Sequence, residues 1–383
     1  MPMKIAMVTT WFPPLVVGSG VRFYEIGKRL SKRHEVHVYT TGCECVGDLP
    51  EAEGGGGLHV HRLRRVELGR SIEEDYHVLK LRFSLDVLRA VRKEDFDVVD
   101  CNVVSKPLVL AAARAGAPLV LTWHEVWGRR NFRLLNPLLA TPAFFVEFIL
   151  PRLASMNVAV SETVRWQLTE VLGAGHGRVV AIPNGIDPKP FESISAEKRY
   201  GRILYAGRLE RHKRVDALIH AYRRLKRNFP EAELIIVGEG PQGRYLRELS
   251  RRLGVDVKFY GFVPRERLVA LMKSAWVFVL PSVREGQGIV LLEAMAAGTP
   301  PVAVAAEGSG VVDVIRDGYN GLLASETPES LEHAIRRLLA DDELHSRLRA
   351  GGLEFVRAYD WDVVAGMVER VYRVVSDEEA ASG

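Results

Sequence analysis

The stretch from residue 276 to residue 300 is the part of the sequence that most constrains the fold. Trp276-Val-Phe-Val-Leu280 is a short apolar run of the kind that forms a buried strand. Residues 289–297 are good helix formers, and Gly298 followed by Pro300 predicts where that helix stops. A buried strand, a glycine-bearing loop and a helix in succession are typical of an α/β sheet that is covered by helices.

The loop inside this stretch combines glycines with carboxylates. Gly286 and Gly288 allow the backbone to approach a ligand closely, and the helix that follows offers free N–H groups and a positive dipole end. Free amides suit a phosphate, whereas the carboxylates of Glu285 and Glu293 suit sugar hydroxyls, and a sugar nucleotide carries both groups. Two glutamates at this spacing alone are more often solvated charges, so the interpretation depends on their neighbours.

Those neighbours resemble a known signature. Glu285 and Glu293, with seven residues between them and Ala294-Met-Ala-Ala-Gly-Thr-Pro300 directly behind, resemble the donor site of retaining glycosyltransferases with the GT-B fold, most closely family 4. The family usually has an aromatic residue where Gln287 stands. The resemblance runs from about residue 3 to residue 375. It implies an α/β protein of two doubly wound, Rossmann-like domains that face each other across a cleft, with the C-terminal helix returning to the first domain.

The order of strands and helices predicts where these domains divide. We expect an acceptor-side domain over residues 1–185 together with a returning helix at 361–376, a hinge near 185–200, and a nucleotide-sugar domain over 200–360. Pro183-Asn-Gly-Ile-Asp187 predicts a turn, and the same residues stand at the domain crossing in the family. Strands are predicted at 4–9, 35–39, 97–100, 118–122, 156–160, 178–182, 202–206, 234–237, 255–260 and 276–280, and helices at 21–30, 75–93, 134–153, 215–229 and 361–375. Residues 54–57 are expected to be a flexible turn, and 191–200 a polar linker.

Composition excludes several classes of protein. The net charge is only +4, with the excess in residues 1–185, and no basic tract is interleaved with aromatic residues, so a nucleic-acid partner is not expected. Three cysteines, Cys43, Cys45 and Cys101, form neither a disulfide framework nor a metal-ligand pattern, which favours reduced thiols and the cytoplasm. The N-terminus is expected to enter a strand directly, without a signal peptide. The apolar segment 134–153 contains prolines and charges and is not expected to span a bilayer.

The first strand and first helix are joined by a loop that ends in Gly18-Ser-Gly20. Such a loop is where a phosphate binds in a doubly wound sheet. Phe23 interrupts the dinucleotide fingerprint and no acidic residue ends the second strand, which argues against a nicotinamide dehydrogenase. The family resemblance implies that Gly18, Ser19 and Gly20 approach the donor phosphate and the acceptor.

His124 follows the predicted strand at 118–122, where ligands bind in parallel sheets. A lone histidine is more often a core residue, but the resemblance implies that His124 faces the donor sugar. Trp123 and Trp127 either stack on a sugar ring or belong to the core. Arg129, with Arg130 and Arg133, precedes the apolar segment 134–153. That pattern fits a lipid-linked acceptor or peripheral contact with the cytoplasmic membrane face, or else a buried helix with a basic collar, which we slightly prefer.

Arg208 and Lys213 lie in the loop after the strand at 202–206 and can converge on a diphosphate. Fixed cations there stabilise a leaving diphosphate without a metal ion. The family also has its arginine and lysine at this place, which favours a donor site over a solvated loop. The resemblance implies that Phe262 and Val263 border the nucleobase and that Glu285 orients the donor sugar and Glu293 the ribose. The remaining donor-site residues expected are Gly207, Gly286, Gln287, Gly288 and Ile289. The resemblance also places the loop 308–313 near the diphosphate, with Asp313 where a glutamate is more usual.

These observations predict a retaining glycosyltransferase that moves a sugar from a nucleotide-diphosphate sugar, such as a UDP- or GDP-sugar, to an acceptor hydroxyl. No cofactor and no metal ion are expected, because Asp95-Phe-Asp97 and Asp360-Trp-Asp362 are interpreted as chance matches to a metal-binding Asp-x-Asp. No residue stands out as a covalent nucleophile, although Glu285 stays an alternative. The alternative functions are a sugar-nucleotide 2-epimerase, a phosphorylase, or a non-catalytic protein that binds nucleotide sugars.

Overall fold

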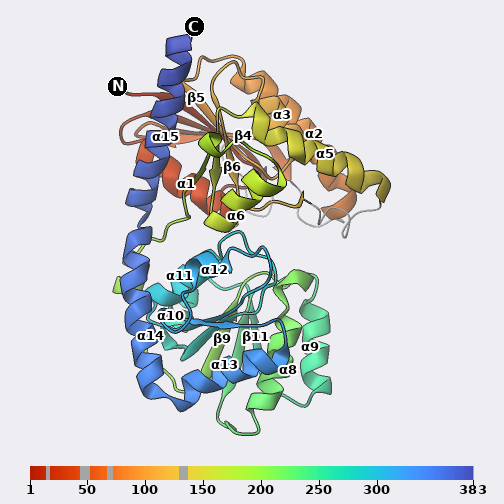
Figure 1. Cartoon of the computed structure of the whole chain (residues 1–383), viewed down its shortest axis with the longest axis vertical. Helices are drawn as coiled ribbons and strands as arrows, with labels where there is room; N and C mark the ends of the chain where they lie inside the picture. The colour runs from red at the N-terminus through yellow and green to blue at the C-terminus, as the bar shows by residue number, and fades with distance from the viewer. Residues whose placement is uncertain (14–17, 44–51, 67–71, 129–136, 383) are drawn as a thin grey trace. The chain divides into compact units, whose positions relative to one another are not determined.

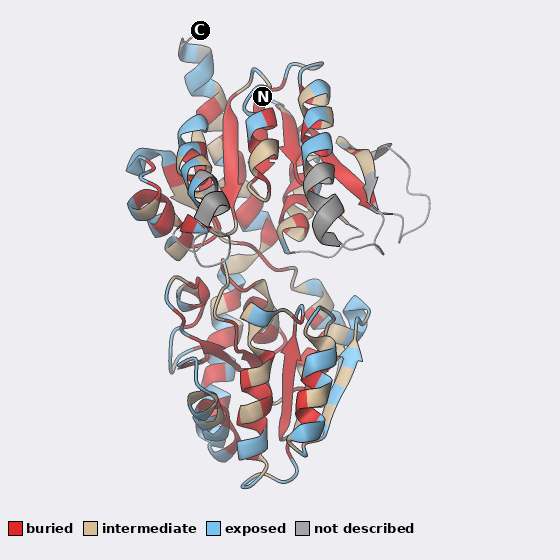
Figure 2. Cartoon of the chain, turned by 90° about the vertical axis from the view of Figure 1, so that its right-hand side faces the viewer, coloured by how far each residue is buried: buried red, intermediate tan, exposed pale blue. Residues whose placement is uncertain are grey.

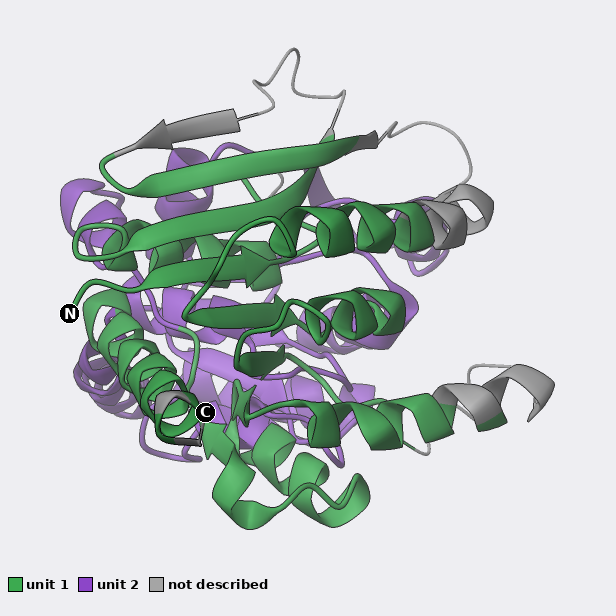
Figure 3. Ribbon diagram, turned by 90° about the horizontal axis from the view of Figure 1, so that it is seen from above, with its two compact units in different colours: residues 1–184, 361–383 green, residues 185–360 purple. Residues whose placement is uncertain are grey.

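The computed structural model describes residues 1–13, 18–43, 52–66, 72–128 and 137–382. The chain forms two compact units: unit 1 comprises Met1–Asn184 and Trp361–Gly383, and unit 2 comprises Gly185–Asp360 (Figure 3). Unit 1 is therefore built from two separate stretches of sequence, whereas unit 2 is continuous. Each unit is an α/β sheet covered by helices on both faces (Figure 1).

Unit 1 contains an eight-stranded sheet in the order β3-β4-β2-β1-β5-β6-β7-β8. All neighbouring strands are parallel except β3 and β4, which form an antiparallel hairpin at one edge. The strands are β1 (Lys4–Val8), β2 (Glu35–Cys43), β3 (Ala52–Gly55), β4 (Leu58–Val66), β5 (Val98–Asn102), β6 (Leu119–Trp123), β7 (Met156–Ala159) and β8 (Val179–Ala181). The helices are α1 (Gly18–Leu30), α2 (Ile72–Val91), α3 (Lys106–Ala112), α5 (Pro137–Leu153), α6 (Glu162–Trp166) and α15 (Trp361–Ser382).

The period-two pattern of β1 explains how this sheet carries a core on each face. Ile5 and Met7 point toward a cluster that includes Phe23 of α1 and Tyr372 of α15. Ala6 and Val8 point the other way, toward residues of α2 and α3. The helix α15 therefore completes the hydrophobic core of unit 1, although it lies at the far end of the sequence.

Unit 2 contains six parallel strands in the order β11-β10-β9-β12-β13-β14 around a single core. The strands are β9 (Arg202–Ala206), β10 (Glu233–Val237), β11 (Val257–Gly261), β12 (Val277–Leu280), β13 (Pro301–Val304) and β14 (Leu322–Ala324). The helices are α7 (Lys189–Ser193), α8 (Val215–Leu225), α9 (Gly243–Arg252), α10 (Arg265–Ser274), α11 (Ile289–Ala296), α12 (Val311–Val314), α13 (Pro328–Ala340) and α14 (Asp342–Phe355). In Figure 2 the strands of its interior are red between helices that turn pale blue faces to solvent.

The structure corrects several predicted elements. The first helix begins at Gly18 rather than residue 21, and the strand predicted at 35–39 continues to Cys43. Of residues 54–57, expected to be a flexible turn, Gly54 and Gly55 belong to strand β3, and Gly56 and Gly57 form the turn of the β3–β4 hairpin. The helix predicted to reach residue 229 ends at Leu225, shortly before Pro230. Residues 189–193, which overlap the predicted linker at 191–200, form the short helix α7, and strands β13 and β14 were not predicted.

Candidate active site

The loops after β9 and β12 lie side by side in the sheet of unit 2. The chain runs from β9 to β10 and β11 in one direction, then returns to the other side of β9 to form β12, β13 and β14. Loops at such a topological switch point diverge and leave room for a ligand at the carboxyl ends of the strands. The Val283 N–H donates to the His212 carbonyl at 3.0 Å, which joins the two loops.

Lys213 and Glu285, which were predicted in the loops after two different strands, meet at this switch point. The Lys213 Nζ lies 2.7 Å from the Glu285 Oε1, and the two side chains are only 19% and 13% exposed. Arg208 is more exposed, at 69%, and pairs with Glu210 at 2.9 Å. Both predicted cations are therefore held by carboxylates of the same loops.

The charges around this pair shift the pKa values of two neighbours. Burial, reinforced by the cations Arg284, Lys213 and Arg208, lowers the pKa of His212 to about 3, so this imidazole is neutral at physiological pH. Burial and the carboxylates of Glu285 and Glu210 raise the pKa of Tyr205 far above its ordinary value. The Tyr205 hydroxyl consequently stays protonated, and it donates to the Arg208 carbonyl at 2.9 Å.

The start of α11 supplies backbone donors beside the ion pair. Gly288 precedes the helix with a φ of +88°, a left-handed conformation that favours glycine, and no side chain caps the helix. The first amides of α11 have no acceptor within the helix. The Gly310 N–H donates to the Glu285 carbonyl at 2.8 Å, which draws the predicted loop 308–313 to the same place. In that loop the buried Ser309 hydroxyl has no hydrogen-bond partner among the described residues.

Other predicted donor residues lie on α11, in the loop before it, and directly after β11. Glu293, on the second turn of α11, forms an ion pair with Arg265 at the start of α10. Sequence analysis missed Arg265, whose only signal was its position directly behind Phe262-Val-Pro264. Phe262 is 72% exposed and Val263 packs partly against the core. Gln287 is buried, so its amide is not an exposed substitute for the aromatic residue that the family usually has.

Unit 1 has its own switch point, between β1 and β5, and buried polar groups gather at the strand ends around it. Several of their atoms have no hydrogen-bond partner in the part of the chain that the structure describes: Thr10 Oγ1, Asn102 Oδ1, Ser105 Oγ, His124 Nε2 and Arg22 Nη2. Buried polar atoms are normally paired, so such a set points to a ligand or to water. Only His124 was predicted. Thr10 and Ser105 could have been found from their positions shortly after β1 and β5, whereas Asn102 is the last residue of β5 and Arg22 lies on α1.

His124 and Arg22 interact electrostatically. Burial and the nearby Arg22 guanidinium lower the pKa of His124 to about 3, which leaves the imidazole neutral. Burial lowers the pKa of Arg22 to about 10, so Arg22 stays charged, and its Nη1 donates to the Pro183 carbonyl at 2.8 Å. Burial raises the pKa of Asp100 to about 6 although the hydroxyls of Tyr372 and Thr122 donate to its carboxylate.

Two predictions about unit 1 need correction. Gly18, Ser19 and Gly20 form the first turn of α1 instead of a loop, and a side chain at Gly20 would put its Cβ 2.6 Å from the Trp11 carbonyl oxygen. Trp123 is 1% exposed, and its indole N–H donates to Asn157 Oδ1 at 2.8 Å. Trp123 is a core residue that cannot stack on a sugar.

The other residues predicted on the acceptor side are Trp127 and Arg129, which precede helix α5. Trp127 is 38% exposed, and its indole N–H donates to Glu125 at 3.2 Å. Arg129 and its basic neighbours lie outside the described residues. The preferred interpretation of α5 as a buried helix is wrong for one face, because three apolar side chains spaced by four residues are exposed: Phe145, Ile149 and Leu153.

Local contacts account for the two Asp-x-Asp triplets. Asp97 accepts a hydrogen bond from the Lys4 backbone N–H at 2.6 Å, and Asp362 forms an ion pair with Arg29. One aspartate of each triplet therefore has a structural partner within unit 1. No helix among residues that the structure describes is long and apolar enough to cross a membrane.

Comparison with known proteins shows where the chain belongs. Residues 188–354 match the family profile "Glycosyl transferases group 1", and residues 16–190 match "Glycosyltransferase Family 4". The chain is 30% identical to an uncharacterized glycosyltransferase of Methanocaldococcus jannaschii, covering 98% of this chain and 99% of the relative. It is 34% identical to the phosphatidyl-myo-inositol mannosyltransferase of Mycobacterium tuberculosis, covering 82% and 84%.

Solved structures show the same architecture. Sucrose-phosphate synthase from Thermosynechococcus elongatus superposes with a TM-score of 0.81 at 22% identity, with both chains covered completely. HepE from Anabaena, solved in complex with UDP-glucose, superposes with a TM-score of 0.75 at 18% identity, over 97% of this chain and 100% of that one. With the GT-B fold and relatives of this kind, the chain belongs to the group 1 glycosyltransferases of family 4 and is a glycosyltransferase.

Proposed function

We propose that this enzyme transfers a sugar from a nucleotide-diphosphate sugar to an acceptor hydroxyl, with retention at the anomeric carbon and without a metal ion. The observation that carries the proposal is the Lys213–Glu285 ion pair beside the uncapped start of α11. A cation, free amides and a carboxylate within one switch point suit a ligand that has both a diphosphate and a sugar. The UDP-glucose complex of Anabaena HepE supports such a donor.

In this proposal the donor diphosphate competes with Glu285 for Lys213. When the diphosphate binds, Lys213 and Arg208 face its negative charge, and Glu285 is released to accept hydrogen bonds from the sugar hydroxyls. Glu293 accepts from the ribose, held in place by Arg265, and the exposed ring of Phe262 covers the nucleobase with Val263 beside it. The amides from Gly286 to Ile289 supply further donors to the diphosphate.

The reaction exchanges one bond at the anomeric carbon for another. The bond from that carbon to the diphosphate oxygen breaks, and its electron pair leaves with the nucleoside diphosphate. The acceptor oxygen forms the new bond on the same face, and its proton passes to the departing phosphate oxygen. Lys213 and Arg208 stabilise the charge that develops on the leaving group, which is the largest electrostatic change in the step.

His124 is proposed to contact the donor sugar as a neutral hydrogen-bonding group. Its Nε2 is buried and has no partner among the described residues, and its lowered pKa excludes a cation at physiological pH. A neutral imidazole positions a hydroxyl without attracting the diphosphate. Trp127 and Arg129 are proposed on the acceptor side.

The acceptor is proposed to be a hydroxyl of a glycan, a glycolipid or a small molecule. The exposed apolar residues Phe145, Ile149 and Leu153 of α5 favour a lipid-linked acceptor and peripheral contact with a membrane. The buried thiol of Cys101 suits the cytoplasm, the compartment proposed for the enzyme.

The test is a panel of UDP-, GDP- and ADP-sugars added to the purified enzyme with a metal chelator present. The true donor should raise the midpoint of thermal unfolding, because a ligand that binds only the folded state stabilises it. That donor is then incubated with candidate acceptors, and the anomeric configuration of the product is read by NMR. Inversion would overturn the retaining mechanism, and a requirement for added metal would overturn metal independence.

Two further outcomes would replace the proposed function. Conversion of the sugar nucleotide without any acceptor would identify an epimerase, and turnover that depends on inorganic phosphate would identify a phosphorylase. Binding without turnover of any donor in the panel would favour the non-catalytic alternative.

A further inference from the structure

Three histidines and a glutamate meet on one face of the unit 1 sheet. Glu35 and His37 stand two residues apart on β2, and His59 and His61 stand two apart on β4. Side chains two residues apart in a strand point to the same face, and the parallel register places His37 opposite His59. Glu35 is the first residue of its strand, so the cluster lies toward the amino-terminal ends of the strands, whereas His124 lies beyond a carboxyl end.

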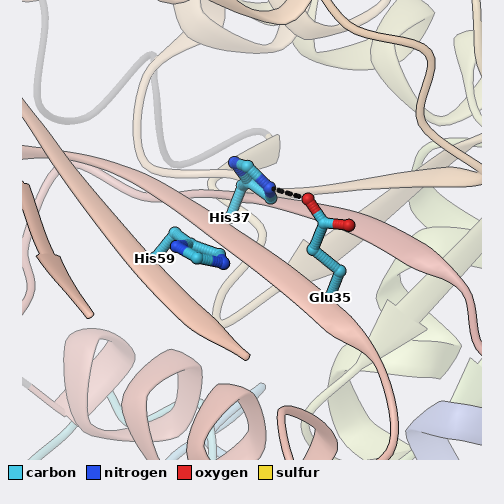
Figure 4. A group of neighbouring side chains, drawn as sticks. All are labelled: Glu35, His37 and His59. Carbon is cyan, nitrogen blue, oxygen red and sulfur yellow. Dashed lines mark hydrogen bonds and ion pairs between the residues drawn. The ribbon is translucent and has the colours of Figure 1, made fainter. Parts of the chain in front are cut away.

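The potential ligand atoms of three of these residues are close together. The Nε2 atom of His37 lies 2.8 Å from the Glu35 Oε1. One ligand atom each from Glu35, His37 and His59 all lie within 4.8 Å of one another (Figure 4). Ligands at about 2.0–2.2 Å from one zinc ion in a tetrahedral site are about 3.5 Å apart. Because Glu35 and His59 are exposed, rotation of their side chains can bring the atoms to that spacing.

From this geometry we propose that Glu35, His37 and His59 bind one divalent transition-metal ion, with zinc as the best match. Two imidazoles and one carboxylate are a ligand set that suits zinc, and a site with three protein ligands leaves the fourth position to water. Bound there, the ion joins β4 to β2 and so secures the β3–β4 hairpin at the edge of the sheet. Its role is structural, because the ion lies toward the amino-terminal ends of the strands, whereas His124 lies beyond a carboxyl end.

A second layer of contacts supports His37 as a ligand. The His37 Nδ1 lies 3.0 Å from the His61 Nε2, and the two rings stack with centroids 5.2 Å apart. When Nε2 of His37 holds a metal, its proton resides on Nδ1 and is donated to His61. Metal-bound histidines usually have such a partner at the other ring nitrogen, which fixes the orientation of the ring.

The charged groups around the cluster favour a cation. Glu35 and Glu94 contribute two carboxylates, and Glu94 lies 3.8 Å from the His37 Nδ1. Lys4 contributes one ammonium group, 3.5 Å from Glu35 and 2.8 Å from Glu94. The net charge of these three side chains is −1 before a metal binds. Lys4 competes with the ion for Glu35 but keeps its shorter contact with Glu94.

The test uses the full chain without an affinity tag, stripped with a chelator that is then removed, and titrated with zinc chloride in a calorimeter. We expect saturable binding of one equivalent. His59→Ala removes an exposed ligand and is expected to weaken binding at least tenfold, with Glu35→Gln as a second variant that also leaves the core intact. His176→Ala is the matched control, because that histidine is exposed and lies far along the sequence at residue 176. Zinc should raise the unfolding midpoint of the control as much as that of the unsubstituted chain. The rise in His59→Ala should be smaller.

Two results would overturn the proposal. One is the absence of saturable zinc binding to the stripped chain. The other is binding by His59→Ala and Glu35→Gln with the stoichiometry and affinity of the control, which would place the ion elsewhere. Because neither readout depends on sugar transfer, the outcome is independent of the proposed function.

Discussion

The ion pair between Lys213 and Glu285 predicts that two substitutions within it change nucleoside-diphosphate affinity in opposite directions. In the proposed function, Lys213→Ala removes a cation that binds the diphosphate. Glu285→Gln removes the carboxylate that competes with the diphosphate for that cation, at 2.7 Å from it. The probe is the nucleoside diphosphate without its sugar, chosen from UDP, GDP and ADP, so that contacts of Glu285 to the sugar do not enter the measurement.

The expected sizes follow from the geometry. Two unit charges about 4 Å apart interact by about 4 kcal/mol at an effective dielectric constant of about 20. The remaining cation, Arg208, and water compensate for about half of this loss, so Lys213→Ala should weaken binding by about 2 kcal/mol, or roughly 30-fold. Relief of the competition in Glu285→Gln should be worth about 1 kcal/mol, or roughly fivefold tighter binding.

Calorimetry on both variants measures these affinities. Arg251→Ala is the control, because it removes an exposed cation that pairs with Glu248 within α9. Turnover with the intact donor should fall in Glu285→Gln, although this variant binds the nucleoside diphosphate more tightly. The reasoning is refuted if Lys213→Ala binds within twofold of the unsubstituted enzyme, or if Glu285→Gln weakens binding as much as Lys213→Ala does.

Three further predictions concern other parts of the site and its support. Arg208→Ala and Glu293→Gln should each raise the KM for the donor at least tenfold with no change in the circular dichroism spectrum, because each removes a charged contact to the diphosphate or the ribose. The pKa of Asp100 is raised from 3.8 to about 6, so this group contributes stability below pH 4 that is lost as the pH rises through 6. Tyr372→Phe removes a donor to the carboxylate and should cost about 2 kcal/mol at pH 8 but about 1 kcal/mol at pH 4.5, measured by urea unfolding. Trp123→Ala should lower the free energy of unfolding by about 3–5 kcal/mol, because it opens a cavity in the core.

Each of these predictions has a matched control in an exposed residue of the same type. Arg251→Ala should leave the donor KM unchanged, Tyr245→Phe should cost little at either pH, and Trp166→Ala should unfold at nearly the same urea concentration as the unsubstituted chain. Unchanged kinetics in both donor-site variants would contradict the site assignment. An equal loss at the two pH values would show that Tyr372 does not support an ionised Asp100.

Local patterns were sufficient to predict the elements that lie around the Lys213–Glu285 ion pair. The apolar run at 276–280, the glycine loop and the helix formers after it correspond to β12 and α11, and the stripe from Val215 to Leu225 corresponds to the buried face of α8. Ser161 directly follows the predicted strand at 156–160, and its hydroxyl caps α6 by accepting from the Val164 N–H at 3.2 Å. These features depend on neighbours within a few residues, which a sequence displays directly.

Features that depend on distant residues were missed. The pairing of Arg265 with Glu293 joins residues 28 positions apart, and nothing in either local pattern indicates it. One local signal was also missed: the second strand of the β3–β4 hairpin alternates apolar and polar residues over Leu58-His-Val-His61, a pattern typical of a half-buried strand. Trp123 and Trp127 look alike in sequence, yet Trp123 is the last residue of β6 and lies in the core. Which face of a strand a residue occupies is set by the sheet, and the sheet assembles from distant segments.

The helix α15 has a consequence for how the chain is made. Its residues Trp361, Val364, Val368 and Tyr372 fill a core that otherwise consists of the first 182 residues. During synthesis, unit 2 is complete at residue 360 and can fold as soon as that residue leaves the ribosome. Unit 1 is synthesised first, but one of its hydrophobic cores stays incomplete, with an apolar face exposed, until α15 has been made. The second unit in the sequence is therefore the first to finish folding, and a prematurely terminated chain lacking α15 would display the open core of unit 1 to the quality-control machinery of the cell.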